Sequence, residues 1–185
     1  MVLCVDVDGV LNNLMDVIID TYNVKYETEF TANDITTYSL DSCFELSVAK
    51  QMKNLFKSSN VWDKVKPLPG AQEGLQKLIN DGHQVYIVTD HDPNTYGTKV
   101  EWIKRFFPFV DPSKIMCVKD KWMLRADLMI EDNLQTLLAK PYYHRVLMDQ
   151  PWNQSTHDWA YDVYRCSNWN EIVDAVNKLK EKEEE

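Results

Sequence analysis

The chain has 185 residues, of which 44% are hydrophobic and 26% are charged, and its formal net charge is −9 at pH 7. This length and composition predict one globular domain with room for a small insertion. The acidic balance argues against a broad surface for long nucleic acids or anionic membranes, because both require basic side chains that neutralise phosphate groups. A small phosphorylated ligand is compatible with it, given a local positive cluster and a metal ion.

The cysteines are typical of a reducing compartment. They lie far apart in the sequence, without a C-x-x-C pair, at Cys4, Cys43, Cys117 and Cys166. We expect them to be small buried core residues. The sequence shows neither a basic segment before an apolar region at its N-terminus nor an apolar run of membrane-spanning length. We therefore expect a cytoplasmic protein, and a homodimer stays open.

The first stretch of the chain is an apolar run, Val2–Val5, which ends in Asp6-Val7-Asp8-Gly9. The run predicts a buried strand. Because side chains alternate along a strand, Asp6 and Asp8 should leave it on the same side, at the edge where open α/β sheets bind ligands. Two carboxylates this close repel each other, so the stretch indicates a cation, a raised pKa, or both. The alternative is a solvated turn after a first strand.

Helices follow this stretch. The spacing of apolar residues predicts one helix over residues 12–25 and another over residues 47–57, with loops or short turns between them. Pro67-Leu68-Pro69-Gly70 then interrupts the helical pattern. We therefore expect a small helical insertion over residues 14–65 and a core formed by residues 1–13 and 66–185.

Helices and strands alternate after this break. Helical faces predict helices over residues 71–80, 96–107 and 168–180. Apolar runs predict strands over residues 84–89, 115–118, 128–130 and 146–148. This alternation predicts an α/β fold with an open, mostly parallel, Rossmann-like sheet flanked by helices. The insertion would form a small helical cap after the first strand.

The ends of the predicted strands carry polar side chains. The second strand ends at Thr89-Asp90, Lys119 and Lys121 follow the third, and the fourth ends at Glu131-Asp132. Each has a structural alternative: a strand terminus, solvated loop charges, or an N-cap for the next helix. Their order and spacing favour a shared site with the carboxylates of the first stretch.

In this order, the residues resemble the four motifs of the haloacid dehalogenase-like phosphohydrolases, which are D-x-D, Thr or Ser, Lys, and an acidic pair. Here they are Asp6-Val7-Asp8, Thr89, Lys121 and Glu131-Asp132. Further segments are similar to the 5′(3′)-deoxyribonucleotidase family, the last of them to its bacterial and phage members: residues 6–11, 67–71, 126–132 and 147–153. The resemblance covers most of the chain.

The resemblance implies a magnesium-dependent phosphomonoesterase that hydrolyses (deoxy)nucleoside monophosphates through an aspartyl-phosphate intermediate. Asp6 would be the nucleophile, and Asp8 would be the general acid and later the general base. Asp6, Asp132 and the backbone carbonyl of Asp8 would hold Mg²⁺, an ion that prefers oxygen ligands.

The resemblance also implies a set of binding residues. Thr89 and Lys121 would bind the phosphoryl oxygens, with Lys119 assisting, because the transferring group needs fixed positive charge. In the insertion, Phe56 and Trp62 are candidates for stacking on a nucleotide base. Their alternative is packing in the core of the cap.

Two positions differ from the family pattern. Asp90 stands where these relatives usually have Ser, and its charge would repel phosphate unless it points away. Leu14 stands where relatives can present an aromatic ring. The base and sugar preference and the position of the phosphate therefore stay open. Two alternatives stay open as well: a phosphatase for another small phosphate ester or a nucleic-acid end, and a non-catalytic nucleotide-binding module on the same fold.

Overall fold

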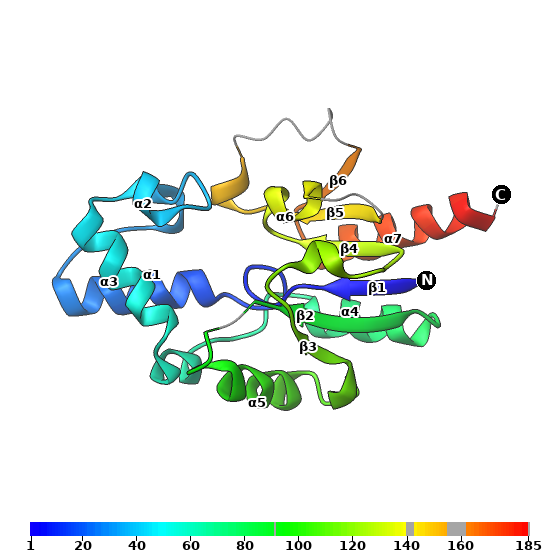
Figure 1. Ribbon diagram of the computed structural model, residues 1–185, viewed down its shortest axis with the longest axis horizontal. Coiled ribbons are helices and arrows are strands. Elements are labelled where there is room, and N and C mark those ends of the chain that lie inside the picture. Colours follow the sequence, from blue (N-terminus) through cyan, green and yellow to red (C-terminus); the bar gives the residue numbers. More distant parts are fainter. Residues whose placement is uncertain (91, 140–142, 155–161, 185) are drawn as a thin grey trace.

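A parallel β-sheet lies at the centre of the computed structural model, which describes residues 1–90, 92–139, 143–154 and 162–184 (Figure 1). Within these ranges the strands follow the order β3-β2-β1-β4-β5-β6, and every neighbouring pair is parallel. They are β1 (Val2–Val5), β2 (Gln84–Thr89), β3 (Ile115–Cys117), β4 (Leu128–Glu131), β5 (His144–Met148) and β6 (Val163–Cys166). The predicted α/β fold with an open parallel sheet is confirmed.

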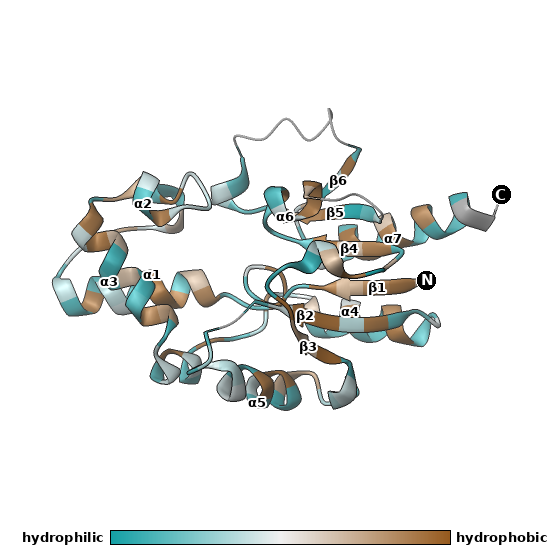
Figure 2. Ribbon diagram, viewed as in Figure 1, coloured by the Kyte–Doolittle hydropathy of each residue, from teal (hydrophilic) through white to brown (hydrophobic). Residues whose placement is uncertain are grey.

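The two faces of the sheet pack into two separate hydrophobic clusters, as the alternation of side chains along a strand requires. Leu3 and Val5 of β1 belong to the larger cluster and Cys4 to the smaller one. Helices α4, α5 and α7 contribute to the larger cluster and α6 to the smaller. Their bounds are α4 (Ala71–Asn80), α5 (Tyr96–Phe106), α6 (Leu134–Leu138) and α7 (Trp169–Glu184). Figure 2 shows apolar residues along the central strands and polar residues on the outer sides of the helices.

Some elements differ in extent from the prediction, and β6 was not predicted at all. It is an edge strand that contains Arg165 and is only partly buried along most of its length, so it lacks the apolar run of a central strand. For the same reason β5 begins at His144 rather than Val146, because its first two side chains are polar and half-buried. The closing helix runs to Glu184 rather than Lys180.

A helical region, formed by the elements between β1 and α4, lies beyond the carboxyl ends of the strands, at the opposite end of the molecule from the N-terminus (Figure 1). It consists of α1 (Leu14–Tyr26), α2 (Leu40–Cys43), α3 (Leu46–Phe56) and the 3-10 helices η1 (Ala32–Asp34) and η2 (Ser59–Asp63). The other 3-10 helices are η3 (Pro112–Lys114), η4 (Lys121–Met123) and η5 (Pro151–Asn153). Across the described residues, helices that combine the length and the apolar character needed to cross a membrane are absent.

The chain enters and leaves this helical region side by side. The backbone N–H of Asn13 donates to the carbonyl of Lys66 at 3.2 Å, and the N–H of Lys66 donates to Asn13 Oδ1 at 2.8 Å. The N–H of Leu68 donates to the carbonyl of Leu11 at 2.9 Å. The expected limits of the cap, residues 14 and 65, lie next to the residues that form these hydrogen bonds, and they stay a prediction.

The order of the strands reverses at β1. From β1 the chain proceeds outward through β2 and β3, then returns to place β4 on the other side of β1. The N–H of Asp6 donates to the carbonyl of Ile130 at 3.0 Å, so Asp6 lies beside the end of β4. In open α/β sheets, ligands bind in the crevice that such a reversal opens beyond the carboxyl ends of the strands. The fold therefore places the residues of the first stretch at the expected binding edge.

Candidate active site

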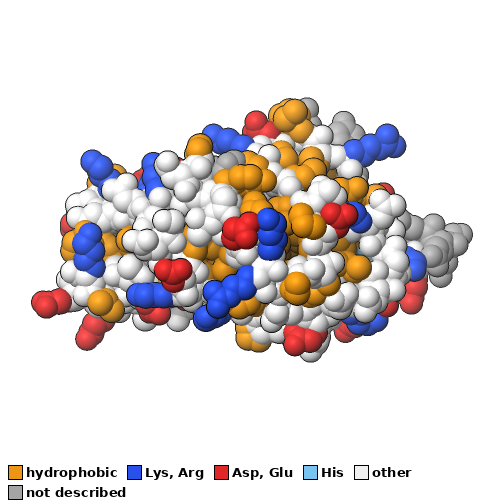
Figure 3. Space-filling view, turned by 90° about the horizontal axis from the view of Figure 1, so that it is seen from below, with side chains coloured by type: hydrophobic (Ala, Val, Ile, Leu, Met, Phe, Trp, Pro, Cys, Tyr) orange, Lys and Arg blue, Asp and Glu red, His pale blue; other side chains and the backbone are white. Residues whose placement is uncertain are grey.

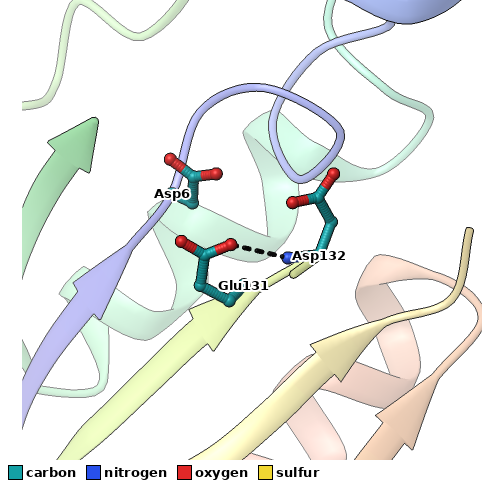
Figure 4. Close-up of side chains that lie close together, drawn as sticks. All are labelled: Asp6, Glu131 and Asp132. Atoms are coloured by element: carbon teal, nitrogen blue, oxygen red, sulfur yellow. Dashed lines mark hydrogen bonds between the residues drawn. The ribbon is translucent and has the colours of Figure 1, made fainter. Parts of the chain in front are cut away.

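Three carboxylates meet where β1 and β4 end. Asp6 follows β1, Glu131 is the last residue of β4, and Asp132 follows it (Figure 4). Their exposed fractions are 6%, 2% and 4%, and one oxygen of each lies within 4.8 Å of the others. Figure 4 shows that the three side chains gather at the ends of adjacent strands. Like charges at this density and burial need compensation by positive charge or protons.

Lys121 supplies part of this compensation. It begins η4, after β3, and its buried Nζ lies 2.6 Å from Asp6 Oδ1 and also donates to Glu131 Oε1. The other oxygen of Glu131 accepts the backbone N–H groups of Asp132 and Asn133, both at 3.1 Å. Both oxygens of Glu131 are therefore engaged, and this residue orients the lysine toward Asp6.

The pKa values at this site reflect the excess of carboxylates over positive charge. Burial, together with the charge of Glu131, raises the pKa of Asp6 to about 7, against the opposing effect of Lys121. Burial and the charges of Glu131 and Asp6 raise the pKa of Asp132 well above its usual value. Burial favours the neutral amine of Lys121, but the neighbouring carboxylates raise its pKa above the usual value. The site therefore favours an additional cation.

Asp8 belongs to a second ion pair, with a residue that sequence reasoning missed. Lys99 of α5 is buried, and its Nζ lies 2.6 Å from Asp8 Oδ2 and 2.9 Å from Thr89 Oγ1. It also donates to the carbonyl of Asp90 at 3.1 Å. The available signal was the position of this lysine, which shares the buried face of α5 with Trp102 and Ile103.

A cavity of about 450 Å³ opens in front of these groups. Its lining combines apolar and aromatic side chains with charged ones. The apolar and aromatic residues include Leu14, Phe56, Trp62 and Trp152, and the charged residues include Asp8, Asp90, Lys99 and Asp132. Lys99 connects this lining to Thr89, and Asp132 is connected through Glu131 to Lys121, which pairs with Asp6. Lys119 is exposed and lies outside the lining. The structure thus brings together all the predicted site residues except Lys119.

The two aromatic candidates in the cap differ in their surroundings. Phe56 is half-buried at the end of α3, whereas Trp62 of η2 is buried. The ring of Trp62 lies 5.9 Å from that of Trp102, and Lys99 Nζ lies 5.4 Å from its centroid. Trp62 therefore packs in the core and borders the cavity at once.

The segment that follows β5 supports the site from the other side. Gln150 Nε2 donates to the carbonyl of Gly9 at 2.6 Å, and Trp152 Nε1 donates to Asp132 Oδ2 at 2.9 Å. Gly9 has φ +73°, and a Cβ there would lie 2.3 Å from Asp132 Oδ2. Only glycine is compatible with both the backbone and this close approach. Sequence reasoning noted the segment by its resemblance but assigned it no role.

The comparison with known families covers nearly the whole chain. Residues 1–182 match the model of the family described as 5′ nucleotidase, deoxy (Pyrimidine), cytosolic type C protein. A 5′(3′)-deoxyribonucleotidase of Bacillus subtilis (strain 168) is 27% identical over 179 residues, which cover 92% of this chain and 95% of that protein. One of Clostridium acetobutylicum is 24% identical over 179 residues, which cover 97% of this chain and 96% of that protein.

Solved structures share the fold. A haloacid dehalogenase-like hydrolase from Streptococcus pneumoniae superposes with a TM-score of 0.66 at 15% identity, over 95% of this chain and 97% of that one. A hydrolase of the same superfamily from Deinococcus radiodurans, solved with bound phosphate and sodium, gives a TM-score of 0.62 at 14% identity, over 97% of this chain and 96% of that one. The resemblance read from the motifs is thereby confirmed. The chain belongs to the 5′ nucleotidase, deoxy (Pyrimidine), cytosolic type C protein family, and its enzyme class is that of the phosphoric monoester hydrolases.

Proposed function

We propose that this enzyme hydrolyses deoxynucleoside monophosphates to nucleoside and phosphate, with Mg²⁺ and through a phosphorylated Asp6. The supporting observation is the unequal environment of the two carboxylates of the opening motif. Asp6 is buried against Lys121, whereas Asp8 pairs with Lys99 and its side chain is 33% exposed at the cavity. Two carboxyl groups in different environments can divide the work of nucleophile and acid.

In the first step, an oxygen of Asp6 forms a bond to phosphorus while the bond from phosphorus to the sugar oxygen breaks. This step requires the acid form of Asp8, which gives its proton to the departing sugar oxygen, so the nucleoside leaves as an alcohol. In the second step, Asp8 takes a proton from water as that water attacks the phosphorus bound to Asp6. Phosphate leaves, and both carboxyl groups return to their starting forms.

The donor set fits Mg²⁺. Asp132 Oδ1 is buried and has no hydrogen-bond partner among the described residues, so it is an oxygen that can coordinate an ion. The carboxylates of Asp6 and Asp132 and the backbone carbonyl of Asp8 would hold the ion, and they are the hard oxygen ligands it prefers. When bound, the ion supplies positive charge that neutralises the transferring phosphoryl group.

Fixed positive charge for the phosphoryl oxygens would come from the buried lysines. Lys121 faces the proposed nucleophile directly, and Thr89 lies at the end of β2 with its hydroxyl against Lys99. We assign phosphate binding to Lys121 and Thr89, and we add Lys99, which also holds Asp8. Lys119 keeps its predicted assisting role, which an exposed residue can fill only near the mouth of the site.

The substrate should be a small nucleotide. The lining of the cavity includes Phe56 and Trp62, which would contact the base from the cap. On the face shown in Figure 3, basic side chains are interspersed with acidic ones, which suits a small substrate better than a long polyanion. The relatives described above are named as deoxyribonucleotidases, which favours a deoxyribose. Action in the cytoplasm also remains part of the proposal, and a homodimer stays open.

A substrate screen tests this function. Deoxynucleoside and ribonucleoside 5′- and 3′-monophosphates, sugar phosphates and 5′-phosphorylated oligonucleotides are compared by phosphate release, with Mg²⁺ and with excess chelator. We expect the highest kcat/KM for deoxynucleoside monophosphates and loss of turnover with chelator. Faster release from sugar phosphates or oligonucleotides would favour the alternative phosphatase. Full turnover in chelator would contradict the metal site.

A further inference from the structure

A short segment after β5 reaches the candidate metal site and ends in a buried tryptophan. Trp152 lies in η5, with an exposed fraction of 7%, and its Nε1 donates to Asp132 Oδ2 at 2.9 Å. An indole N–H donates one hydrogen bond and accepts none. The contact therefore occupies one chosen oxygen of the carboxylate.

The two oxygens of Asp132 are consequently unequal. Oδ2 accepts the indole N–H, whereas Oδ1 is buried and without a partner among the residues that the structure describes. The backbone carbonyl of Asp132 also accepts Asn153 Nδ2, at 2.8 Å. Both the main chain and the side chain of Asp132 are thus held, with Oδ1 left as the coordinating atom.

The segment that carries the tryptophan is itself fixed. Arg165 of β6 donates to Asn153 Oδ1 at 2.7 Å and to the Asn153 carbonyl at 2.9 Å, and it pairs with Asp149. Gln150 binds the carbonyl of Gly9 on the opposite side. A support held at several points can keep a ligand in one orientation, since its own side chains have little freedom.

We propose that Trp152 is a positioning residue that makes Asp132 bind the ion through Oδ1 alone and thereby favours Mg²⁺ over Ca²⁺. The inference rests on the proposed function. Mg²⁺ demands near-octahedral coordination and suits a carboxylate that offers one oxygen, whereas Ca²⁺ takes six to eight oxygens and accepts both oxygens of a carboxylate. Bidentate binding by Asp132 would require Oδ2 to give up the indole hydrogen bond.

The experiment measures metal binding without substrate. Wild type and Trp152→Phe, which keeps an aromatic ring and removes the N–H, are titrated calorimetrically with Mg²⁺ and separately with Ca²⁺. We expect the Kd for Mg²⁺ to rise about tenfold or more, as is common when the partner of a metal ligand is removed. The Kd for Ca²⁺ should change less, so the preference for Mg²⁺ should fall.

Trp102→Phe is the matched control. Trp102 is also buried, and its Nε1 donates to the carbonyl of Val65 at 3.0 Å, so the variant loses the same kind of hydrogen bond elsewhere. Its affinities for both ions should stay at the wild-type values. Unchanged affinities in Trp152→Phe, or equal losses for Mg²⁺ and Ca²⁺, would overturn the inference while leaving the proposed function in place.

Two further measurements separate the remaining outcomes. Failure of the wild type to bind Mg²⁺, or binding that Asp132→Asn does not weaken, would overturn the proposed metal site and this inference together. If circular dichroism shows that Trp152→Phe does not fold, the indole protons of the wild type are followed by nuclear magnetic resonance. The signal most broadened by Mn²⁺ should exchange with solvent more slowly in Mg²⁺ than in Ca²⁺. Equal exchange in the two ions would overturn the inference.

Discussion

Two groups of polar side chains share the carboxyl edge of the sheet and differ in the exposure of their carboxylates. We call one the sheet group: Asp6, Lys121, Glu131 and Asp132. We call the other the cavity group: Asp8, Thr89 and Lys99. Every side chain of the sheet group is buried, whereas Asp8 of the cavity group keeps a third of its side chain exposed. The sheet group suits bond making at phosphorus, and the cavity group suits proton exchange with a substrate and with water.

The largest expected effect separates the two opening carboxylates. Asp6→Asn should abolish turnover of every phosphate ester, because an amide cannot replace the attacking carboxylate. Asp8→Asn should still be phosphorylated by p-nitrophenyl phosphate, since nitrophenolate leaves without a proton, and should then stall for lack of a base. We expect a burst of nitrophenol that approaches one equivalent, with a phosphoryl group on the peptide that contains Asp6.

Equal losses in Asp8→Asn for nucleotides and for p-nitrophenyl phosphate, with neither burst nor phosphopeptide, would mean that Asp6 and Asp8 do not divide the work in this way. Direct attack by a metal-activated water would then be the better mechanism. The two groups would then have no separate chemical roles, although Asp8 would still be the exposed carboxylate.

The second prediction concerns the cation of the sheet group. Lys121→Ala should lower kcat/KM by roughly a hundredfold or more for all substrates, because loss of one oriented donor typically costs about 3 kcal/mol in such sites. Lys119→Ala is the matched control, because this neighbouring lysine is exposed, and it should cost much less. Small and equal losses would show that neither lysine contributes to binding of the phosphoryl group.

The third prediction concerns the cation of the cavity group. Lys99→Met keeps most of the buried stem and removes the charge that holds Asp8. We expect kcat/KM to fall about tenfold for nucleotides and less for p-nitrophenyl phosphate, because Asp8 loses the partner that orients it and only the poor leaving group needs its proton. Steady-state kinetics on both substrates measures the split. An equal loss on both would assign Lys99 to phosphate binding alone.

The two groups also differ in how far the sequence predicts them. Asp6 and Asp132 were predicted because strand alternation and short motifs depend on neighbouring residues. Lys99 was not, since it meets Asp8 across 91 positions of the sequence through the packing of α5. Trp152 escaped assignment for the same reason, because its contact with Asp132 depends on how the segment after β5 folds back. Local patterns thus predict the strand ends, whereas contacts from helices and loops require the assembled fold.

The fourth prediction tests the cap at the far side of the cavity group. Phe56→Ala should raise KM for nucleotides several-fold and affect p-nitrophenyl phosphate much less, because this ring packs against the core from a half-buried position and borders the cavity, where it can contact a base. Trp62→Ala should affect both substrates, since its ring also packs on Trp102 beside Lys99. Equal effects of Phe56→Ala on both substrates would assign Phe56 to the core of the cap.

The smallest effect is on stability, and its sign follows from the raised pKa of Asp6. An ordinary aspartate has a pKa of 3.8, and Asp6 in the folded, metal-free protein has a pKa of about 7. At a pH between 3.8 and about 7, Asp6 keeps a proton in the folded chain that it has released in the unfolded chain. Its contribution to the free energy of unfolding therefore falls as the pH rises. Asp6→Asn removes this contribution. The metal-free variant should therefore be more stable than the wild type at neutral pH.

Thermal melting in chelator at about pH 5 and about pH 8 measures the effect. From the lower to the higher pH, the melting temperature of the wild type should fall a few degrees more than that of Asp6→Asn. Asp63→Asn, at an exposed position in η2, should behave like the wild type. Mg²⁺ should stabilise the wild type most at the higher pH, because the ion binds the ionised carboxylate and not the protonated one. The same pH dependence in Asp6→Asn as in the wild type would show that the proton on Asp6 does not contribute to stability, and the pH dependence would then have to come from other groups of the folded chain.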